Sequence, residues 1–309
     1  MGSLKKKIAR QADRKLAQVQ GKLRRILEGE AIAYKKANKL TLGKVYGEEG
    51  WDNMQCVFML STGRTGTQTM ANVLKLSAKV LAEHEPRPRL VKSSFDAYMD
   101  VGSEDWMTRW TDFVLAVRDD FVLEANAKGQ VYVESNNRLT YVAPAVAAAF
   151  PASKFIFSHR DPYQVIQSGM RRGAYAGPNM AWNFARIRPR AGEPFADSWE
   201  TMAPLAKEAW RWARINQISI DFIETLPAGR GMELPARRLF GGSTEMIREI
   251  FDFIGVPCPD MADIQRVMGK KMNAQAHFNG LSFEWTAADY KLVRPYIASV
   301  AEALGYELK

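Results

Sequence analysis

The chain has 309 residues, of which 43 are Lys or Arg and 34 are Asp or Glu, so its formal charge is +9. With 47 % hydrophobic and 25 % charged residues, the composition argues against a disordered, collagen-like or low-complexity chain. The excess charge is unevenly placed: residues 1–44 hold 13 Lys/Arg and 3 Asp/Glu, a net of +10, whereas the rest hold 30 and 31, a net of −1. We therefore expect a basic arm with its linker (1–46) attached to a nearly neutral domain (47–309).

The cysteine and histidine content excludes several classes of protein. Cys56 and Cys258 lie in unrelated contexts, and no CxxC motif or histidine pair at ligand spacing occurs, so we expect neither a disulfide framework nor a zinc site. No apolar run approaches the roughly 20 residues that span a bilayer. The charged N-terminus has no apolar segment behind it, unlike a secretory signal. These features favour a cytoplasmic protein.

The arm is the first predicted element. From Leu4 to about Lys39, apolar residues recur at three- and four-residue steps opposite a Lys/Arg-rich face, which predicts an amphipathic helix. Two partners fit such a helix: the anionic inner face of a membrane, bound peripherally, or the body or a second copy of the chain. We favour the helix contact. The nearly neutral body argues against extended nucleic-acid binding.

After the arm, short apolar runs alternate with segments of helical spacing. In chain order, the pattern predicts a strand at 55–60, a helix at 67–75, a weaker strand at 80–83, a helix at 106–127, a strand at 131–133, a helix at 139–150, a strand at 154–158 and a helix at 162–172. The remainder is predicted to be mostly helical, over roughly 199–226, 243–254, 260–270 and 286–303. This alternation predicts an α/β fold, a central parallel sheet flanked by helices on both faces.

The loop between the first strand and its helix has the composition of an anion site. Two glycines let successive N–H groups converge, the helix N-terminus adds its positive dipole end, and threonine hydroxyls and an arginine add donors. The candidate residues are Thr62, Gly63, Arg64, Thr65, Gly66, Thr67, Gln68 and Thr69. No lysine follows the second glycine, so the loop is not a Walker A motif. A turn in which Gly and Thr only cap the helix is an equal alternative.

In a second segment, Lys154–Tyr163, a predicted strand leads into a helix, and Arg160 lies at the carboxyl end of the strand. In a parallel sheet, that position near a helix N-terminus suits a second anion. Asp161 is predicted to cap the helix that Pro162 begins. The alternative is an Arg–Asp surface pair within an ordinary turn.

In order and separation, these two motifs resemble those of the PAPS-dependent sulfotransferase family, and of its bacterial type. The resemblance covers about residues 52–308 and implies a P-loop-like three-layer fold, PAPS as donor, PAP as product and no required metal. It implies that residues 62–69 cradle the 5′-phosphosulfate, with Arg64 near the sulfuryl bridge where cytosolic animal enzymes carry lysine. Arg160 and Ser168 would bind the 3′-phosphate. Family members carry a basic loop over that phosphate where this chain has Lys270, Lys271 and Asn273, without its glycine-rich version.

Sulfuryl transfer to a hydroxyl or amine needs a group that accepts the acceptor's proton. His84 and Glu85 follow the second strand, and Glu134 follows the third. The resemblance does not choose among them, because relatives use either His or Glu. The ordinary pKa of histidine suits the task, whereas Glu85 or Glu83 would need its pKa raised by burial. Purely structural roles for His84 and Glu134 are the alternatives.

The acceptor is expected to be a carbohydrate, a lipid headgroup or another small molecule. Aromatic and arginine residues alternate in Met180–Arg188, a stretch suited to contact a sugar or an anionic headgroup. Core positions are predicted for Trp199, Trp210 and Trp212, a scaffold role for His159, and a place in the loop over the donor for His277. Two other functions stay open: a degenerate P-loop nucleotide kinase or NTPase that needs Mg²⁺, and a binding module that docks on membranes through the arm.

Overall fold

The computed structural model describes residues 53–176, 185–241, 243–269 and 282–309. Several predictions concern residues outside these ranges: the arm, most of the segment Met180–Arg188, and the residues Lys270, Lys271, Asn273 and His277. They stay predictions, as does the division of the chain into an arm and a domain.

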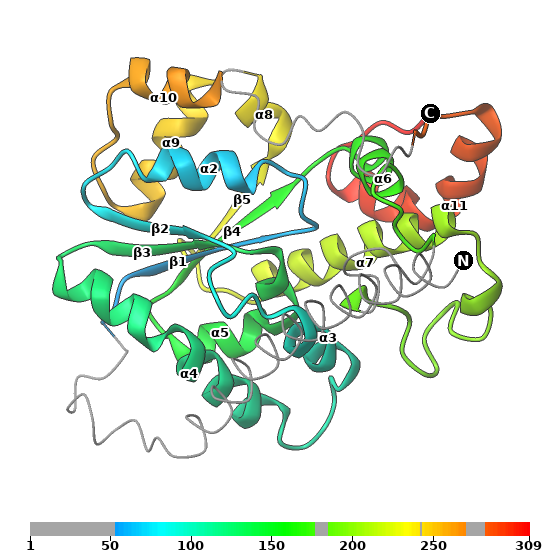
Figure 1. Cartoon of the computed structure of the whole chain (residues 1–309), viewed down its shortest axis with the longest axis horizontal. Coiled ribbons are helices and arrows are strands. Elements are labelled where there is room, and N and C mark those ends of the chain that lie inside the picture. Colours follow the sequence, from blue (N-terminus) through cyan, green and yellow to red (C-terminus); the bar gives the residue numbers. More distant parts are fainter. Residues whose placement is uncertain (1–52, 177–184, 242, 270–281) are drawn as a thin grey trace, which may run out of the picture.

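Five parallel strands form a sheet with the order β2-β3-β1-β4-β5 (Figure 1). They are β1 (Cys56–Ser61), β2 (Val80–His84), β3 (Val131–Ser135), β4 (Lys154–His159) and β5 (Gly231–Pro235). Every residue of the central β1 is buried, which is why its sequence is a continuous apolar run. Of these strands, only β5 was not predicted. It lies at the edge of the sheet, Leu234 is its one buried residue, and it begins with Gly231 and ends with Pro235.

Helices cover both faces of the sheet, as predicted (Figure 1). They are α2 (Thr67–Leu74), α3 (Val91–Met99), α4 (Trp106–Ala127), α5 (Ala143–Ala149), α6 (Pro162–Met170), α7 (Pro204–Glu224), α8 (Ala236–Phe240), α9 (Thr244–Ile254), α10 (Met261–Met268) and α11 (Ala287–Ala303), with 3₁₀ turns η2 (Asn137–Val142) and η4 (Trp199–Thr201). Alternate β1 residues face opposite layers: Phe58 and Leu60 pack with α4 and α5, and Val57 and Met59 with α2 and α9. The fold therefore has three layers.

Two helices differ from their predicted form because of proline. The segment predicted as one helix over 139–150 is the 3₁₀ turn η2 followed by α5, which has Pro144 in its first turn. The helix predicted from 199 starts at Pro204, since proline favours the first helical position. Trp199, Trp210 and Trp212 are buried, as predicted.

The topology sets where the functional residues meet. β1 lies between β3 and β4, with Ser61 opposite Ser158, so the loops that follow β1 and β4 emerge side by side at the carboxyl edge. β2 and β3 end at the same edge, with His84 opposite Ser135. In the part of the chain that the structure describes, no helix has the length and apolar character needed to cross a membrane.

Candidate functional site

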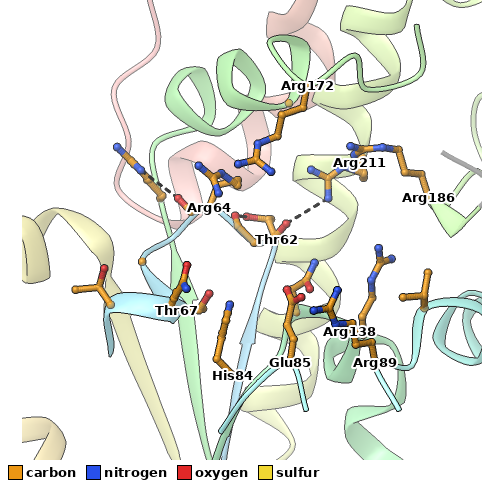
Figure 2. Close-up of a pocket in the computed structure, with 18 of the residues that line it drawn as sticks. Thr62, Arg64, Thr67, His84, Glu85, Arg89, Arg138, Arg172, Arg186 and Arg211 are labelled. Carbon is orange, nitrogen blue, oxygen red and sulfur yellow. Dashed lines mark hydrogen bonds between the residues drawn. The ribbon is translucent and has the colours of Figure 1, made fainter. Parts of the chain in front are cut away.

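A cavity of about 520 Å³ opens at the carboxyl edge of the sheet (Figure 2). Of the described residues that line it, two are carboxylates, Glu85 and Glu208, and seven are arginines. The arginines are Arg64, Arg89, Arg138, Arg160, Arg172, Arg186 and Arg211. This excess of guanidinium groups in a recess suits an anionic ligand.

The loop after β1 has the backbone of an anion-binding turn. Gly63, Arg64 and Gly66 have φ values of 75°, 64° and 91°, in the left-handed region. Such residues turn neighbouring N–H groups toward a common point at the start of α2. Gly66 is the N-cap residue of α2 and no side chain caps this helix, so the threonines of the loop do not serve as caps. At Gly66 a Cβ atom would lie 2.5 Å from Cζ of Phe240, so glycine is also required for space.

Most of the predicted loop residues reach the cavity, but one does not. Thr62, Gly63, Arg64, Gly66, Thr67, Gln68 and Thr69 line it. Thr65 is fully buried behind the loop, and its carbonyl accepts a hydrogen bond from Ser158 Oγ at 3.5 Å. Among the described residues its hydroxyl oxygen has no hydrogen-bond partner, and its predicted contact with the ligand stays a prediction.

The two predicted anion motifs meet. Nη1 of Arg160 donates to the carbonyl oxygen of Arg64 at 3.1 Å, and Nε of Arg64 donates to Oγ of Ser168 at 3.0 Å. Asp161 accepts from the N–H of Gln164 at 2.9 Å and caps α6, as predicted, rather than forming a surface pair with Arg160. The two hydrogen bonds join residues that are 96 and 104 positions apart in the sequence, so distant segments contribute to one site.

Among the described residues, neither Arg64 nor Arg160 forms an ion pair with a carboxylate, and their side chains donate to uncharged oxygens. Burial, with repulsion from Arg172 and Arg160, lowers the pKa of Arg64 to about 10. Burial also lowers the pKa of Arg160. Both groups are still cationic at neutral pH. A bound anion would favour their charged forms and so raise both pKa values.

His84 has one ring nitrogen committed and the other directed into the cavity (Figure 2). Oγ of Ser135 donates its proton to the carbonyl of Thr67 at 2.9 Å. Toward His84 it can therefore only accept, so Nδ1 of His84, 2.8 Å away, carries the hydrogen. Burial lowers the pKa of His84, and the neutral ring holds its lone pair on Nε2.

The two candidate carboxylates have different places. Glu85 lines the cavity beside His84, and its N–H donates to the carbonyl of Ser135 at 3.1 Å. Glu134 is fully buried away from it, and its oxygens accept two hydrogen bonds from Arg118, at 2.5 and 2.9 Å, and one each from Tyr132 and Asn136, at 2.9 Å. The expectation that Glu134 serves as a base is corrected, because its oxygens are saturated with donors.

Glu208 on α7 organises a part of the cavity that the sequence did not indicate. Its buried carboxylate accepts from Arg211 at 2.6 and 2.8 Å and from Arg186 at 3.3 Å. Burial alone would raise the pKa of Glu208, but these arginines hold it below its usual range. Nη1 of Arg211 also donates to the carbonyl of Thr62 at 3.3 Å, which ties α7 to the anion loop.

Close packing of α6 and Phe240 completes the lining. A Cβ at Gly169 would lie 2.2 Å from Oε1 of Glu208, so glycine is what lets α6 approach α7 here. Phe240, at the end of α8, is 49 % exposed, and the Arg160 guanidinium lies 5.6 Å from its ring centroid. Among the described residues, no group of three or more His, Cys, Asp or Glu is arranged to hold a metal ion.

Comparison with known proteins identifies the family. The sequence profile described as the sulfotransferase family matches residues 56–260 of this chain. This chain belongs to the sulfotransferase family. The search of curated protein sequences returned no match to this sulfotransferase.

Solved structures of bacterial sulfotransferases share its fold. The sulfotransferase domain from the curacin biosynthetic pathway aligns with a TM-score of 0.52 and 17 % identity, over 84 % of this chain and all (100 %) of that one. The domain from the Synechococcus PCC 7002 olefin synthase gives 0.51 and 15 %, over 84 % and 97 %. STF9 from Mycobacterium avium gives 0.51 and 15 %, over 92 % and 86 %. The predicted family, in its bacterial type, and the predicted fold are confirmed.

Proposed function

We propose that this sulfotransferase moves a sulfuryl group from PAPS to a hydroxyl or amine of a carbohydrate, lipid headgroup or other small molecule, releasing PAP. The observation that carries the proposal is the pair Arg64 and Arg160, whose pKa values are lowered where two anion motifs meet. A ligand with negative groups at two points, as PAPS has, would neutralise both. The proposal needs no metal.

The residues present fit such a donor. The loop Thr62–Thr69 would hold the 5′-phosphosulfate, and Arg160 and Ser168 the 3′-phosphate. Oγ of Ser168 accepts from Arg64 and keeps its own proton to donate to an anion. Phe240 offers an exposed aromatic face to the purine. The proposal also retains Lys270, Lys271 and Asn273, outside the described residues, as the basic loop over the 3′-phosphate.

The chemistry divides between two residues. PAPS supplies a sulfuryl group bonded to a phosphate leaving group. Arg64 would neutralise the charge that builds on the bridging oxygen as that bond breaks. Nε2 of His84 would accept the proton that the acceptor loses when its oxygen or nitrogen bonds to sulfur. Glu85 lines the cavity beside His84 and, being negative, would stabilise the imidazolium that forms.

A transfer assay with ³⁵S-labelled PAPS and a lysate of the source cell tests the proposal. We expect label to move to an acceptor, and His84→Ala to slow the transfer by about 10²–10⁴-fold, the usual contribution of a positioned base. His159→Ala is not a suitable control, because His159 is buried between Glu233 and Tyr306. Gln217→Ala, on the exposed side of α7, should leave the rate unchanged.

Two results would contradict the proposal. Wild-type transfer by His84→Ala would remove His84 as the base and favour Glu85. Absence of any transfer, together with Mg²⁺-dependent turnover of ATP, would favour the kinase or NTPase class instead.

The location of the protein and the role of the basic arm also belong to the proposal. A reducing cytoplasm is supported by Cys56 and Cys258, which are both free, with Cys56 buried in the core. The arm would contact either the inner face of a membrane or another helix, of this chain or of a second copy. Sedimentation with anionic vesicles, with and without residues 1–44, separates the two partners.

A further inference from the structure

A second group of arginines lies in the same cavity, apart from the anion loop. Figure 2 shows Arg89 and Arg138 on the opposite side of Glu85 from His84 and Thr67. Arg89 lies in the loop between β2 and α3, and Arg138 lies in η2. Arg186 and Arg211 complete this side, which we call the acceptor half of the cavity.

The charges of the acceptor half do not balance. Its four arginines face two carboxylates, Glu85 and Glu208, which leaves a formal excess of two positive charges. Glu208 is already shared between Arg186 and Arg211. Within the described part of the chain, no ion pair joins Arg89 or Arg138 to a carboxylate, and the guanidinium of Arg138 donates to the carbonyl of Ala185, at 3.0 Å.

A guanidinium placed in this way is costly for the free protein. Burial lowers the pKa of Arg138, and the nearby charges of Arg186 and Arg211 lower it further; Tyr141 and the charge of Glu85 oppose this shift but do not reverse it. Buried charges in proteins are normally paired with an opposite charge. Because Glu208 fixes Arg186 and Arg211, these two arginines cannot move aside to relieve the repulsion.

PAPS does not account for this half of the cavity. If the proposed function is correct, the anionic groups of the donor lie at Arg64 and Arg160, in the segments that follow β1 and β4. The acceptor must reach Nε2 of His84 from the remaining side, where Arg89 and Arg138 are found.

We propose that the acceptor carries an acidic group, a carboxylate, a phosphate ester or a sulfate ester, which Arg89 and Arg138 bind while its hydroxyl or amine faces His84. This inference rests on the proposed function. The planar fork of arginine matches such oxyanions bidentately and would fix the position of the acceptor. A neutral acceptor would leave both guanidinium groups without a partner in the Michaelis complex.

Calorimetric titration of inorganic sulfate into the PAP-saturated protein, at constant ionic strength, tests the inference. PAP fills the donor side except for the position of the transferred sulfuryl group, so it is weaker sulfate binding in the Arg89 and Arg138 variants that assigns the sulfate to the acceptor half. We expect one sulfate per chain, and a dissociation constant raised about tenfold or more in Arg89→Ala and Arg138→Ala, as for the loss of a hydrogen bond to a charged group. Arg89 is exposed, so its variant keeps the test valid if Arg138→Ala does not fold. Arg266→Ala, on the surface of α10, is the matched control.

The outcomes separate this inference from the proposed function. Binding of PAP without sulfate, or sulfate binding that neither substitution weakens, overturns the acidic acceptor and leaves the sulfotransferase proposal intact. Failure to bind PAP contradicts the proposed function, and the inference of an acidic acceptor, which rests on it, is then contradicted as well.

Displacement of the sulfate distinguishes the two sources of an acidic acceptor. Methyl glucuronide, with methyl glucoside as its neutral partner, represents carbohydrates. Glycerophosphoglycerol, with glycerol, represents lipid headgroups. The inference requires that at least one acidic probe displaces sulfate better than its neutral partner. The probe that does so shows whether the acceptor is a carbohydrate or a lipid headgroup. Equal displacement by acidic and neutral partners, or none, contradicts it.

Discussion

Two buried arginine sites in this molecule have opposite surroundings. Within the core, Arg118 and Glu134 are both fully buried and form a two-pronged ion pair. At the carboxyl edge of the sheet, Arg64 and Arg160 are also partly buried, yet their side chains bond to a serine hydroxyl, a backbone carbonyl and an amide oxygen. The first site contains its own ion pair, whereas in the described part of the chain neither arginine of the second site forms one.

The pKa directions express this difference. Burial alone would lower the pKa of Arg118, but the charge of Glu134 outweighs burial and raises it. For Arg64 nothing offsets burial and the two neighbouring arginines, so its pKa falls. The carboxylate of Glu134 compensates the buried charge of Arg118, whereas Arg64 has no carboxylate partner among the described residues.

The Arg118–Glu134 pair nevertheless has an indirect connection with the cavity. Nη2 of Arg118 donates to the carbonyl of Pro88 at 3.2 Å, and Pro88 precedes Arg89. Glu134, Arg118 and Pro88 thus anchor the loop that carries Arg89. This is the structural role of the strand-end carboxylate that the sequence offered as a base.

The largest effect on folding is expected from Glu134→Ala. It leaves Arg118 buried without a counter-charge, and we expect the free energy of unfolding to fall by about 3–5 kcal/mol, as for other broken buried pairs. Urea denaturation measures this loss. The affinity of the remaining folded protein for PAP should stay within about twofold, because Glu134 does not line the cavity.

The exposed pair Arg238–Glu249 supplies the control. Its side chains are 42 % and 39 % exposed, so Glu249→Gln should cost no more than about 1 kcal/mol. If Glu134→Ala lowers the free energy of unfolding no more than Glu249→Gln does, the contrast between the buried pair and a surface pair fails.

A smaller effect is expected on the pH dependence of kcat/KM. The base must be neutral, so activity is lost as pH falls through the pKa of His84. Burial lowers that pKa, which places the acid limb below the ordinary histidine value of about 6.5. The charge of Glu85 opposes this shift, so Glu85→Gln should move the limb to still lower pH. A pH profile of sulfuryl transfer for the two proteins measures both midpoints.

The direction of the shift is decisive. A wild-type midpoint above pH 6.5, or a limb that Glu85→Gln moves upward, would show that His84 is not the neutral base described here. If the acid limb moves to lower pH in Glu85→Gln but not in Glu83→Gln, the effect is assigned to the charge of Glu85.

Most of the sheet could be predicted from the sequence because its buried strands are continuous apolar runs. β1, β3 and β4 have this form, and the alternation with helices implied parallel strands. β5 is exposed at the edge. The N-cap of α3 is Leu90, which has a left-handed backbone conformation and no capping side chain, so the sequence carries no local signal for either element. Their positions depend on tertiary packing.

The candidate site was predictable where its residues follow strands. The sequence indicated the loop after β1, Arg160 after β4 and His84 after β2, because parallel strands end at one edge. Glu208 and Arg211 lie on α7, and Phe240 on α8, and the direction of a helix face is known only from the fold. One signal was present: Glu208 and Arg211 occur among the apolar residues Ala209, Trp210 and Trp212, in a stretch of α7 that is buried on all sides.

The most direct test of the central claim is calorimetric titration with PAP of the wild-type protein, Arg64→Ala and Arg160→Ala, with Arg266→Ala as control. If the uncompensated arginines bind the donor, PAP binds the wild type and the control alike, and each cavity substitution weakens it by about tenfold or more, with little change in the free energy of unfolding. Wild-type affinity in both Arg64→Ala and Arg160→Ala would contradict the account.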